Sequence, residues 1–191
     1  MQNPPARLKT FIRELGRVSQ ACANEESRML ATGRELLKDL VAHDDWLPDA
    51  YAQPHPEYYR QYLLHLDPMA RFSIVSFVWG PGQQTPVHDH TVWGLIGMLR
   101  GGEVGERFEC TAEGRPMRSL GSETLLPGNT DQVSPAVGDV HQVRNLYQDR
   151  VSISIHVYGA DIGRVSRHVY DPSTGTARTF ISGYSEPVAS S

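Results

Sequence analysis

From about residue 57 onward the chain is a succession of short β-type runs, and this pattern limits the possible folds more than any other feature. The runs are rich in Val, Ile, Phe, Tyr and Trp and are separated by Gly, Pro, Asn and Asp. Many short strands at close spacing, with turn residues between them, are typical of a β-sandwich or a small β-barrel. The runs are YYRQYLLHL, RFSIVSFVWG, VWGLIGMLRG, GERFECTA, VGDVHQVRNLY, RVSISIHVYG, SRHVYD and ARTFISG.

The N-terminal part has a different periodicity. Its apolar residues recur at helical spacing in two stretches, one over residues 6–23 and one that follows Asn24. They are Leu8, Phe11, Ile12, Leu15 and Val18, then Met29, Leu30, Leu36, Leu37, Leu40 and Val41. We expect two helices that pack on the rest of the protein and carry no chemistry. The 191 residues suffice for a single domain over 1–191, with a helical extension over 1–50 and a β-barrel over 51–191.

Composition and charge exclude several classes of function. The net charge is −4 with the two signs interspersed, so we expect no nucleic-acid partner. No apolar run approaches membrane-spanning length, and the N-terminus lacks the apolar core of a signal peptide. The two cysteines, Cys22 and Cys110, are far apart and form no C-x-x-C motif, which fits a reducing compartment. We therefore expect a cytoplasmic protein without a membrane partner.

Two histidines, His88 and His90, lie one residue apart in the segment PVHDHTVWGLIGMLRGG. Side chains alternate along a strand, so an extended segment places both imidazoles on one face and Asp89 on the other. Two imidazoles on one face make half of a site for a divalent transition metal. Such pairs also arise by chance, and the alternative is two exposed polar residues on an edge strand.

A further histidine, His141, has a characteristic frame. Two residues separate it from Gly138, and three separate it from Asn145. This frame and the earlier histidine pair, with its flanking glycines, resemble the two motifs of the cupin superfamily. The resemblance implies a mainly β fold, a jelly-roll-like cupin barrel on which the N-terminal helices pack.

The sequence departs from the cupin motifs at two points. Gly94 stands where the first motif usually has a metal-binding glutamate, and the second motif, residues 135–138, has one extra residue between proline and glycine. The metal ligands that remain are His88, His90 and His141. Three neutral imidazoles leave a divalent ion with its full charge, which favours an anionic, chelating substrate. Zinc also accepts three histidines, so these ligands alone do not exclude a hydrolytic or lyase zinc enzyme.

Residues 154–158 form a run in which polar and apolar side chains alternate. Ser154, His156 and Tyr158 would share one face of a strand and form a hydrogen-bonded row that fixes the phenol and tunes its proton. HDHTVWG, the downstream His141 and Ser-x-His-x-Tyr together resemble the thiol dioxygenases, the cysteine dioxygenase family. The resemblance extends from about Tyr58 to Arg167.

This resemblance implies ferrous iron on the three histidines. The substrate thiolate and O2 would bind at neighbouring positions on the metal, and both oxygen atoms would go to sulfur to give a sulfinate. Tyr158 would contact the substrate and the oxygen, oriented by His156 and Ser154. The competing interpretation makes His156 a fourth metal ligand.

Two positions indicate which thiol is oxidised. In mammalian-type relatives a cysteine is cross-linked to the catalytic tyrosine, and Gly94 occupies its place here, so no such cross-link can form with Tyr158. Cys110 is in another run, where we expect a small buried residue. The relatives also bind the substrate carboxylate through an arginine, and Gln61 occupies its place.

The chain thus resembles the Gln-type bacterial branch, associated with 3-mercaptopropionate. In that branch an arginine after the Ser–His–Tyr strand binds the carboxylate; Arg167 matches it, with Arg164 as the alternative. A one-residue shift of register would substitute Arg60 for Gln61.

The predicted function is an iron-dependent thiol dioxygenase whose partners are a small thiol substrate and O2. The alternatives are cysteine dioxygenase proper, a non-catalytic binding cupin and a zinc-dependent cupin. The ordered phenol beside the metal argues against mere binding.

Overall fold

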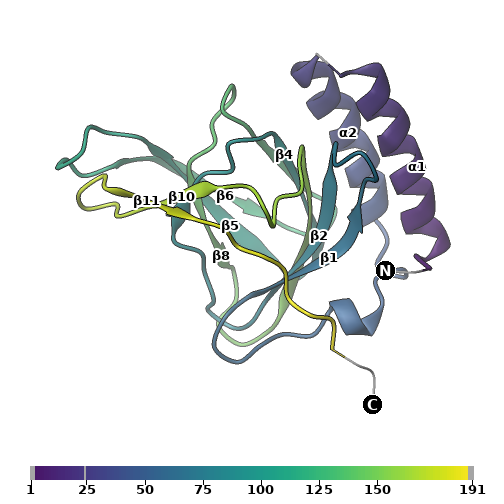
Figure 1. Ribbon diagram of the computed structural model, residues 1–191. Helices are drawn as coiled ribbons and strands as arrows, with labels where there is room; N and C mark the ends of the chain where they lie inside the picture. The colour runs from purple at the N-terminus through teal and green to yellow at the C-terminus, as the bar shows by residue number, and fades with distance from the viewer. Residues whose placement is uncertain (1–2, 24, 189–191) are drawn as a thin grey trace.

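The computed structural model describes residues 3–23 and 25–188, which form a helical hairpin followed by a barrel of two antiparallel sheets (Figure 1). The helices are α1 (Ala6–Ala21) and α2 (Glu26–Val41), and the 3-10 turn η1 (Asp49–Tyr51) leads into the barrel. No helix in this described part of the chain is long and apolar enough to cross a membrane.

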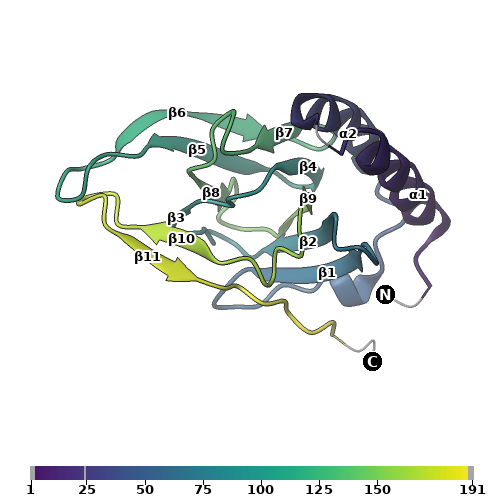
Figure 2. The ribbon, with the colours of Figure 1, turned by 45° about the horizontal axis from the view of Figure 1, so that its top comes forward.

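Each sheet mixes strands that are distant in the sequence. The five-stranded sheet has the order β1 (Arg60–Leu66), β2 (Ser73–Trp79), β9 (Ser152–Tyr158), β4 (Gly94–Arg100) and β7 (Thr130–Val133). The six-stranded sheet has the order β11 (Ala177–Phe180), β10 (Arg167–Tyr170), β3 (Val87–His88), β8 (His141–Asn145), β5 (Glu103–Glu109) and β6 (Arg118–Leu125). Figure 2 shows the two sheets on opposite sides of the barrel and the helices outside it.

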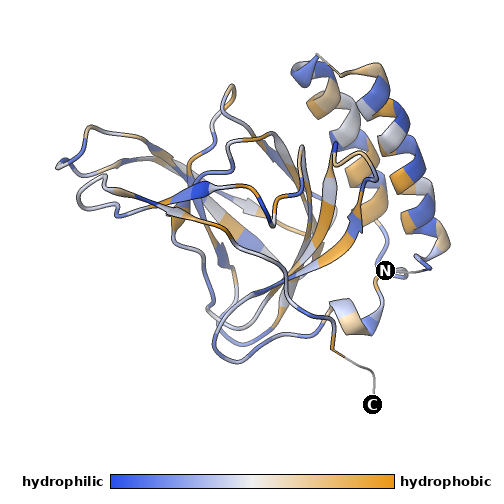
Figure 3. Cartoon of the chain, viewed as in Figure 1, coloured by the Kyte–Doolittle hydropathy of each residue, from blue (hydrophilic) through white to orange (hydrophobic). Residues whose placement is uncertain are grey.

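The five-stranded sheet is buried on both faces, which explains why β2 and β9 contain only buried residues. One face packs against the helices; its apolar side chains include Ile74, Ile155 and Val157. The other face lines the barrel interior with Phe77 and Tyr158 among others. Figure 3 shows the corresponding hydrophobic colour on the strands and on the helices beside them. Burial of apolar surface on two sides stabilises the sheet that carries the site.

Glycines bring α2 close to β4. A Cβ atom on Gly97 of β4 would lie 2.9 Å from Leu37 Cγ, and one on Gly33 of α2 would lie 2.8 Å from Leu95 Cδ1. Side chains at these positions would push the helix outward, so small residues are needed on both elements.

The predicted mainly β barrel with two N-terminal helices is confirmed. Two strands were not predicted from the sequence, β6 and β7. β6 is almost entirely exposed and β7 has only four residues, so neither carries the long apolar run from which strands are predicted.

Candidate metal centre

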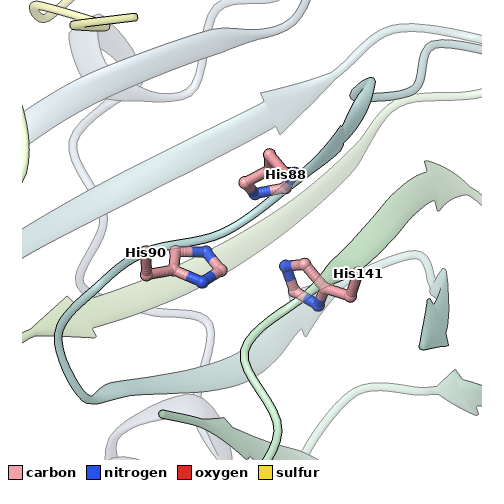
Figure 4. Close-up of side chains that lie close together, drawn as sticks. All are labelled: His88, His90 and His141. Atoms are coloured by element: carbon pink, nitrogen blue, oxygen red, sulfur yellow. The ribbon is translucent and has the colours of Figure 1, made fainter. Parts of the chain in front are cut away.

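Three histidines from two parts of the chain meet in the barrel interior. His88 ends β3 and His141 begins β8, and these two residues are direct partners in the antiparallel register. His90 follows two residues after His88 and turns its ring toward the same point (Figure 4). The structure therefore brings together all three predicted metal ligands.

The three rings form a nearly equilateral triangle. Their centroids are 4.9 Å apart for His88 and His90, 4.8 Å for His88 and His141, and 4.9 Å for His90 and His141. One ring nitrogen from each residue lies within 4.8 Å of the others, and all three residues are buried. Such a cluster can hold one divalent transition-metal ion.

Hydrogen bonds orient two of the rings. His88 Nδ1 lies 3.0 Å from the Pro86 carbonyl oxygen, which can only accept, so Nδ1 carries the hydrogen and Nε2 keeps its lone pair. His90 Nδ1 lies 2.8 Å from Asp139 Oδ1, so here too Nδ1 carries the hydrogen and Nε2 keeps its lone pair. A carboxylate or carbonyl behind a metal-binding imidazole fixes the tautomer that a metal needs.

Burial keeps the cluster uncharged. It lowers the pKa of His88 to about 4 and holds the pKa values of His90 and His141 well below their usual range, and the neighbouring histidines add to the effect on His90 and His141. Neutral imidazoles are the form that binds metal, so the site is ready for a cation at neutral pH.

The local backbone differs from the expected continuous strand. Strand β3 ends at His88, and Thr91 has a positive φ of 60°, so His90 lies in an irregular segment before β4. The Asp139 carboxylate accepts hydrogen bonds from the backbone N–H groups of His90 and Thr91 and so stabilises this turn. Asp139 was not predicted as a site residue, although its place two residues before His141 in the second motif was a usable signal.

Asp89 points away from the two histidines, as alternation predicts. Its carboxylate accepts hydrogen bonds from His168 and from the Tyr170 hydroxyl, each 2.8 Å long. His168 is therefore a structural partner. The prediction for Cys110 was wrong: it is exposed and directly follows the last residue of β5.

The row of polar residues on β9 is hydrogen-bonded as its alternation predicts. Ser154 Oγ lies 2.9 Å from His156 Nε2, and His156 Nδ1 lies 2.8 Å from the Tyr158 hydroxyl. Trp79 Nε1 also donates to Ser154 Oγ at 3.0 Å. Burial lowers the pKa of His156 to about 3 and raises that of Tyr158, so both side chains are neutral.

Tyr158 lies beside the histidine cluster. Its ring stacks on His90 with a centroid distance of 5.2 Å. A Cβ atom on Gly94 would lie 3.0 Å from Tyr158 Cδ1 and 3.1 Å from Cε1, so Gly94 abuts the phenol ring from the neighbouring strand. His156, in contrast, already uses both ring nitrogens within the row.

Arg167 is a buried cation near this cluster, with only 4% of its surface exposed. Its Nη2 donates to Ser182 Oγ at 2.7 Å, its guanidinium lies over the Phe180 ring at 4.6 Å, and its Nε has no hydrogen-bond partner among the described residues. Its charge lowers the pKa values of His88 and Tyr158. The alternative residue, Arg164, has 88% of its side chain exposed and lies 3.5 Å from Asp161.

The register of β1 distinguishes Gln61 from Arg60. Gln61 pairs with Phe77, whose side chain lies in the barrel interior, whereas Arg60 pairs with Val78 on the helix side. Gln61 is buried, and its Nε2 donates to the Gly183 carbonyl. Its backbone bonds to Ser185, so Gln61 positions the C-terminal segment that also contains the Arg167 partner Ser182.

These features define a β-barrel protein with a buried three-histidine cluster beside a hydrogen-bonded phenol. The residues fit a metal, because the two ring nitrogens that are hydrogen-bonded to Pro86 and Asp139 leave the others free to bind. The family model described as cysteine dioxygenase type I matches residues 41–171, more than half of the chain. The chain belongs to this family, so the resemblance to the cysteine dioxygenase family found in its sequence is confirmed.

Several solved structures are similar in part. A protein of Thermus thermophilus is 20% identical, with a TM-score of 0.46 over 62% of this chain and 98% of that one. A cupin superfamily protein of Desulfitobacterium hafniense is 15% identical, with a TM-score of 0.46 over 62% and 94%. A double-stranded β-helix protein of Klebsiella pneumoniae is 18% identical, with a TM-score of 0.45 over 59% and 80%.

Proposed function

We propose that the protein uses O2 and one ferrous ion, held by His88, His90 and His141, to oxidise a small thiol carboxylic acid to its sulfinate. The preferred substrate would be 3-mercaptopropionate, giving 3-sulfinopropionate. The observation that carries this proposal is Arg167, a buried guanidinium near the histidine cluster that forms no ion pair with a carboxylate among the described residues. A buried cation without a counter-ion is costly, and a substrate carboxylate would supply the missing charge.

The cluster can hold a metal cation through three histidines, without a carboxylate ligand among them. Its three neutral imidazoles leave the charge of the ion to be balanced by an anionic ligand, and a thiolate is such a ligand. Membership of the cysteine dioxygenase family favours iron over zinc. When bound, the metal would supply the redox chemistry that joins a thiol sulfur to dioxygen.

Arg167 would bind the substrate carboxylate. A guanidinium offers parallel N–H donors that match the two oxygens of a carboxylate, and charge-assisted bonds of this kind are short and directional. Arg167 Nε is an unused donor in a buried position, while Ser182 and Phe180 hold the group in place. The substrate would thus be fixed at its carboxylate end, with its sulfur toward the cluster.

Tyr158 would act as the proton-handling group at the reacting sulfur and oxygen atoms. Its ring lies against His90, and its hydroxyl is bonded to His156, which is bonded in turn to Ser154. Fixed in this way, the phenol can donate or accept a hydrogen bond at a constant position without rotating. The buried surroundings keep its proton in place until a substrate arrives.

The alternative substrate within the family is L-cysteine, which would give cysteine sulfinate. Cysteine carries an ammonium group as well as a carboxylate and would need a partner for each. Gln61, in the place of the family arginine, already donates its amide N–H to Gly183. A thiol acid without an ammonium fits a site with one buried cation, which favours 3-mercaptopropionate.

The experiment is O2 consumption by iron-loaded protein, with 3-mercaptopropionate, L-cysteine and cysteamine compared side by side. We expect kcat/KM to be highest for 3-mercaptopropionate, since this ratio measures discrimination in the transition state. A clear preference for cysteine would replace the proposed substrate with the alternative. Equal activity of protein loaded with zinc would contradict the iron assignment.

A further inference from the structure

A buried carboxyl group, Glu103, lies at the far end of the Ser–His–Tyr row. Glu103 is on the inner side of β5, 1% exposed, and its Oε2 has no hydrogen-bond partner among the described residues. Ser154, on β9 across the barrel, interacts with this carboxyl group through its hydroxyl. A buried acid with an unused oxygen at the end of a hydrogen-bonded row calls for a functional explanation.

The hydrogen bonds that Ser154 Oγ accepts leave its hydroxyl hydrogen available to donate to Glu103. The Trp79 indole N–H can only donate, so Ser154 Oγ accepts from it. When the Tyr158 hydroxyl donates to His156 Nδ1, the ring hydrogen is on Nε2 and Ser154 Oγ accepts a second bond. Both lone pairs of Oγ are then occupied, and the serine hydrogen can only point to a further acceptor. Glu103 is the carboxylate with which the Ser154 hydroxyl interacts.

Glu103 also lines a cavity of about 210 Å³ on the side of the barrel between β4, β5, β6, β7 and β8. Polar residues of its lining include Arg107, Ser122, Asp131 and His141. A polar cavity of this size has room for several water molecules, each with hydrogen-bond partners in the wall. The cavity thus offers Glu103 a route for proton exchange with water.

The charges around Glu103 suit proton exchange. Burial raises its pKa to about 7, Ser154 opposes the rise by hydrogen bonding and Asp131 adds to it. Asp131 of β7 is paired at 2.8 Å with Arg107 of β5, and the exposed Glu123 of β6 lies at the cavity wall. The neutral His141 of β8 lines the cavity as well, and His156 of β9 is hydrogen-bonded to Ser154.

We propose that Glu103 is the terminal proton acceptor of a relay that runs from Tyr158 through His156 and Ser154 to the polar cavity. The inference rests on the proposed function. Oxidation of a thiol to a sulfinate, RSH + O2 → RSO2⁻ + H⁺, releases one proton inside a buried site. In the relay the phenolic O–H bond breaks as an Nδ1–H bond forms, and the Nε2–H proton passes to Ser154 Oγ. The serine proton then passes to Glu103, the thiol proton replaces that of the phenol, and no electrons move.

The test uses Glu103→Gln, which keeps the shape of the side chain but cannot accept the proton, and Glu103→Asp, which keeps a carboxyl group. The control is Glu106→Gln, three residues along β5 and hydrogen-bonded to Ser119 away from the site. We measure iron content, kcat and KM for 3-mercaptopropionate, and the solvent deuterium isotope effect on kcat. Infrared titration of the metal-free proteins measures protonation of the buried carboxyl group directly.

We expect Glu103→Gln to lower kcat by about 10²-fold, the lower end for loss of a positioned acid–base group, with iron content and KM unchanged. The solvent isotope effect should rise, because proton release becomes slower. Glu103→Asp should recover part of the rate, and Glu106→Gln should match the wild type. The infrared band of a protonated carboxyl should titrate near neutral pH in the wild type and vanish in Glu103→Gln.

A wild-type kcat and isotope effect in Glu103→Gln would overturn the relay, as would the absence of a carboxyl titration near neutral pH. An Asp variant no faster than the Gln variant would also count against it. A wild-type protein that oxidises no thiol would overturn the proposed function instead. The infrared titration, which needs neither metal nor substrate, would still decide whether Glu103 exchanges a proton in the neutral range.

Discussion

Tyr158 is restrained on three sides. His90 stacks on its ring, Gly94 lies against its edge, and His156 bonds its hydroxyl at 2.8 Å. A phenol held in this way has lost its rotational freedom before the substrate binds, which is the condition for an efficient proton-transfer group. The geometry of the site is therefore fixed by single side chains whose positions are determined by their neighbours.

Removing the Tyr158 hydroxyl tests this arrangement. Tyr158→Phe keeps the ring, so the fold and the iron content should survive, and we expect kcat to fall by about 10²–10⁴-fold. His156→Asn should lower kcat in the same direction but less. The measurement is steady-state O2 consumption with iron analysis on each variant. An unchanged rate in Tyr158→Phe would make the row purely structural.

Replacing Arg167 tests whether this side chain binds the substrate carboxylate. A charge-assisted hydrogen bond contributes roughly 1.5–3 kcal/mol, so Arg167→Ala should raise KM for carboxylate thiols by about 10- to 150-fold. Cysteamine has no carboxylate, so its kinetics should hardly change. The matched control is Arg164→Ala, because that side chain is 88% exposed. Equal losses for cysteamine and 3-mercaptopropionate would show that Arg167 does not bind the carboxylate.

At the scale of elements, β9 presents the hydrogen-bonded polar row on one face and packs on the helices with the other. Ile155 and Val157 belong to the core beneath the helices, whereas His156 between them reaches the site. The hairpin from β1 to β2 is closed by Asp67, which accepts hydrogen bonds from the N–H groups of Met69 and Arg71. Arg71 also approaches the Gly16 carbonyl of α1, so this turn connects the barrel to a helix.

The Asp67–Arg71 pair makes stability depend on pH. Hydrogen bonding to Arg71 lowers the Asp67 pKa from 3.8 to about 2, so the folded state favours the carboxylate. The stabilisation is present above the unfolded pKa and is lost as the pH falls from about 4 to about 2. It amounts to about 2 kcal/mol, since one pKa unit corresponds to about 1.4 kcal/mol.

Chemical denaturation of Asp67→Asn is the measurement. We expect its free energy of unfolding to be about 2 kcal/mol below that of the wild type at neutral pH, with the difference shrinking in the acid range. Asp39→Asn, an exposed substitution on α2, serves as the control. A difference that stays constant down to pH 2 would show that the pair does not control this dependence.

At the scale of the molecule, the sequence predicted those parts of the site that depend on spacing within one strand or motif. His88 with His90 and the row from Ser154 to Tyr158 follow from alternation, and His141 follows from its motif. The burial of Glu103 beside Ser154 could not be predicted, because the two residues are distant in the sequence, whereas Asp139 had a usable signal in its place before His141. The irregular turn at Thr91 was missed as well, since a positive φ at a non-glycine residue is set by the Asp139 carboxylate and not by local preference.

At the same scale, two hydrophobic clusters lie on the two faces of the five-stranded sheet. The helices cover one face of the five-stranded sheet and leave the other to the site, so the barrel interior holds polar chemistry without losing its packing. The predicted helices were located correctly because amphipathic spacing is strong over four turns. The order of the strands could not be predicted from the sequence, because β9 pairs with β2 and β4, which are distant from it along the chain.

The most direct test of the proposed dioxygenase reaction is the fate of both oxygen atoms of O2. Iron-loaded protein is given 3-mercaptopropionate under ¹⁸O2, and the product is analysed by mass spectrometry beside a His141→Ala variant. We expect a sulfinate that carries two labelled oxygen atoms, formed by the wild type and not by the variant. A product with oxygen from water, a disulfide as the main product, or an equally active His141→Ala variant would contradict it.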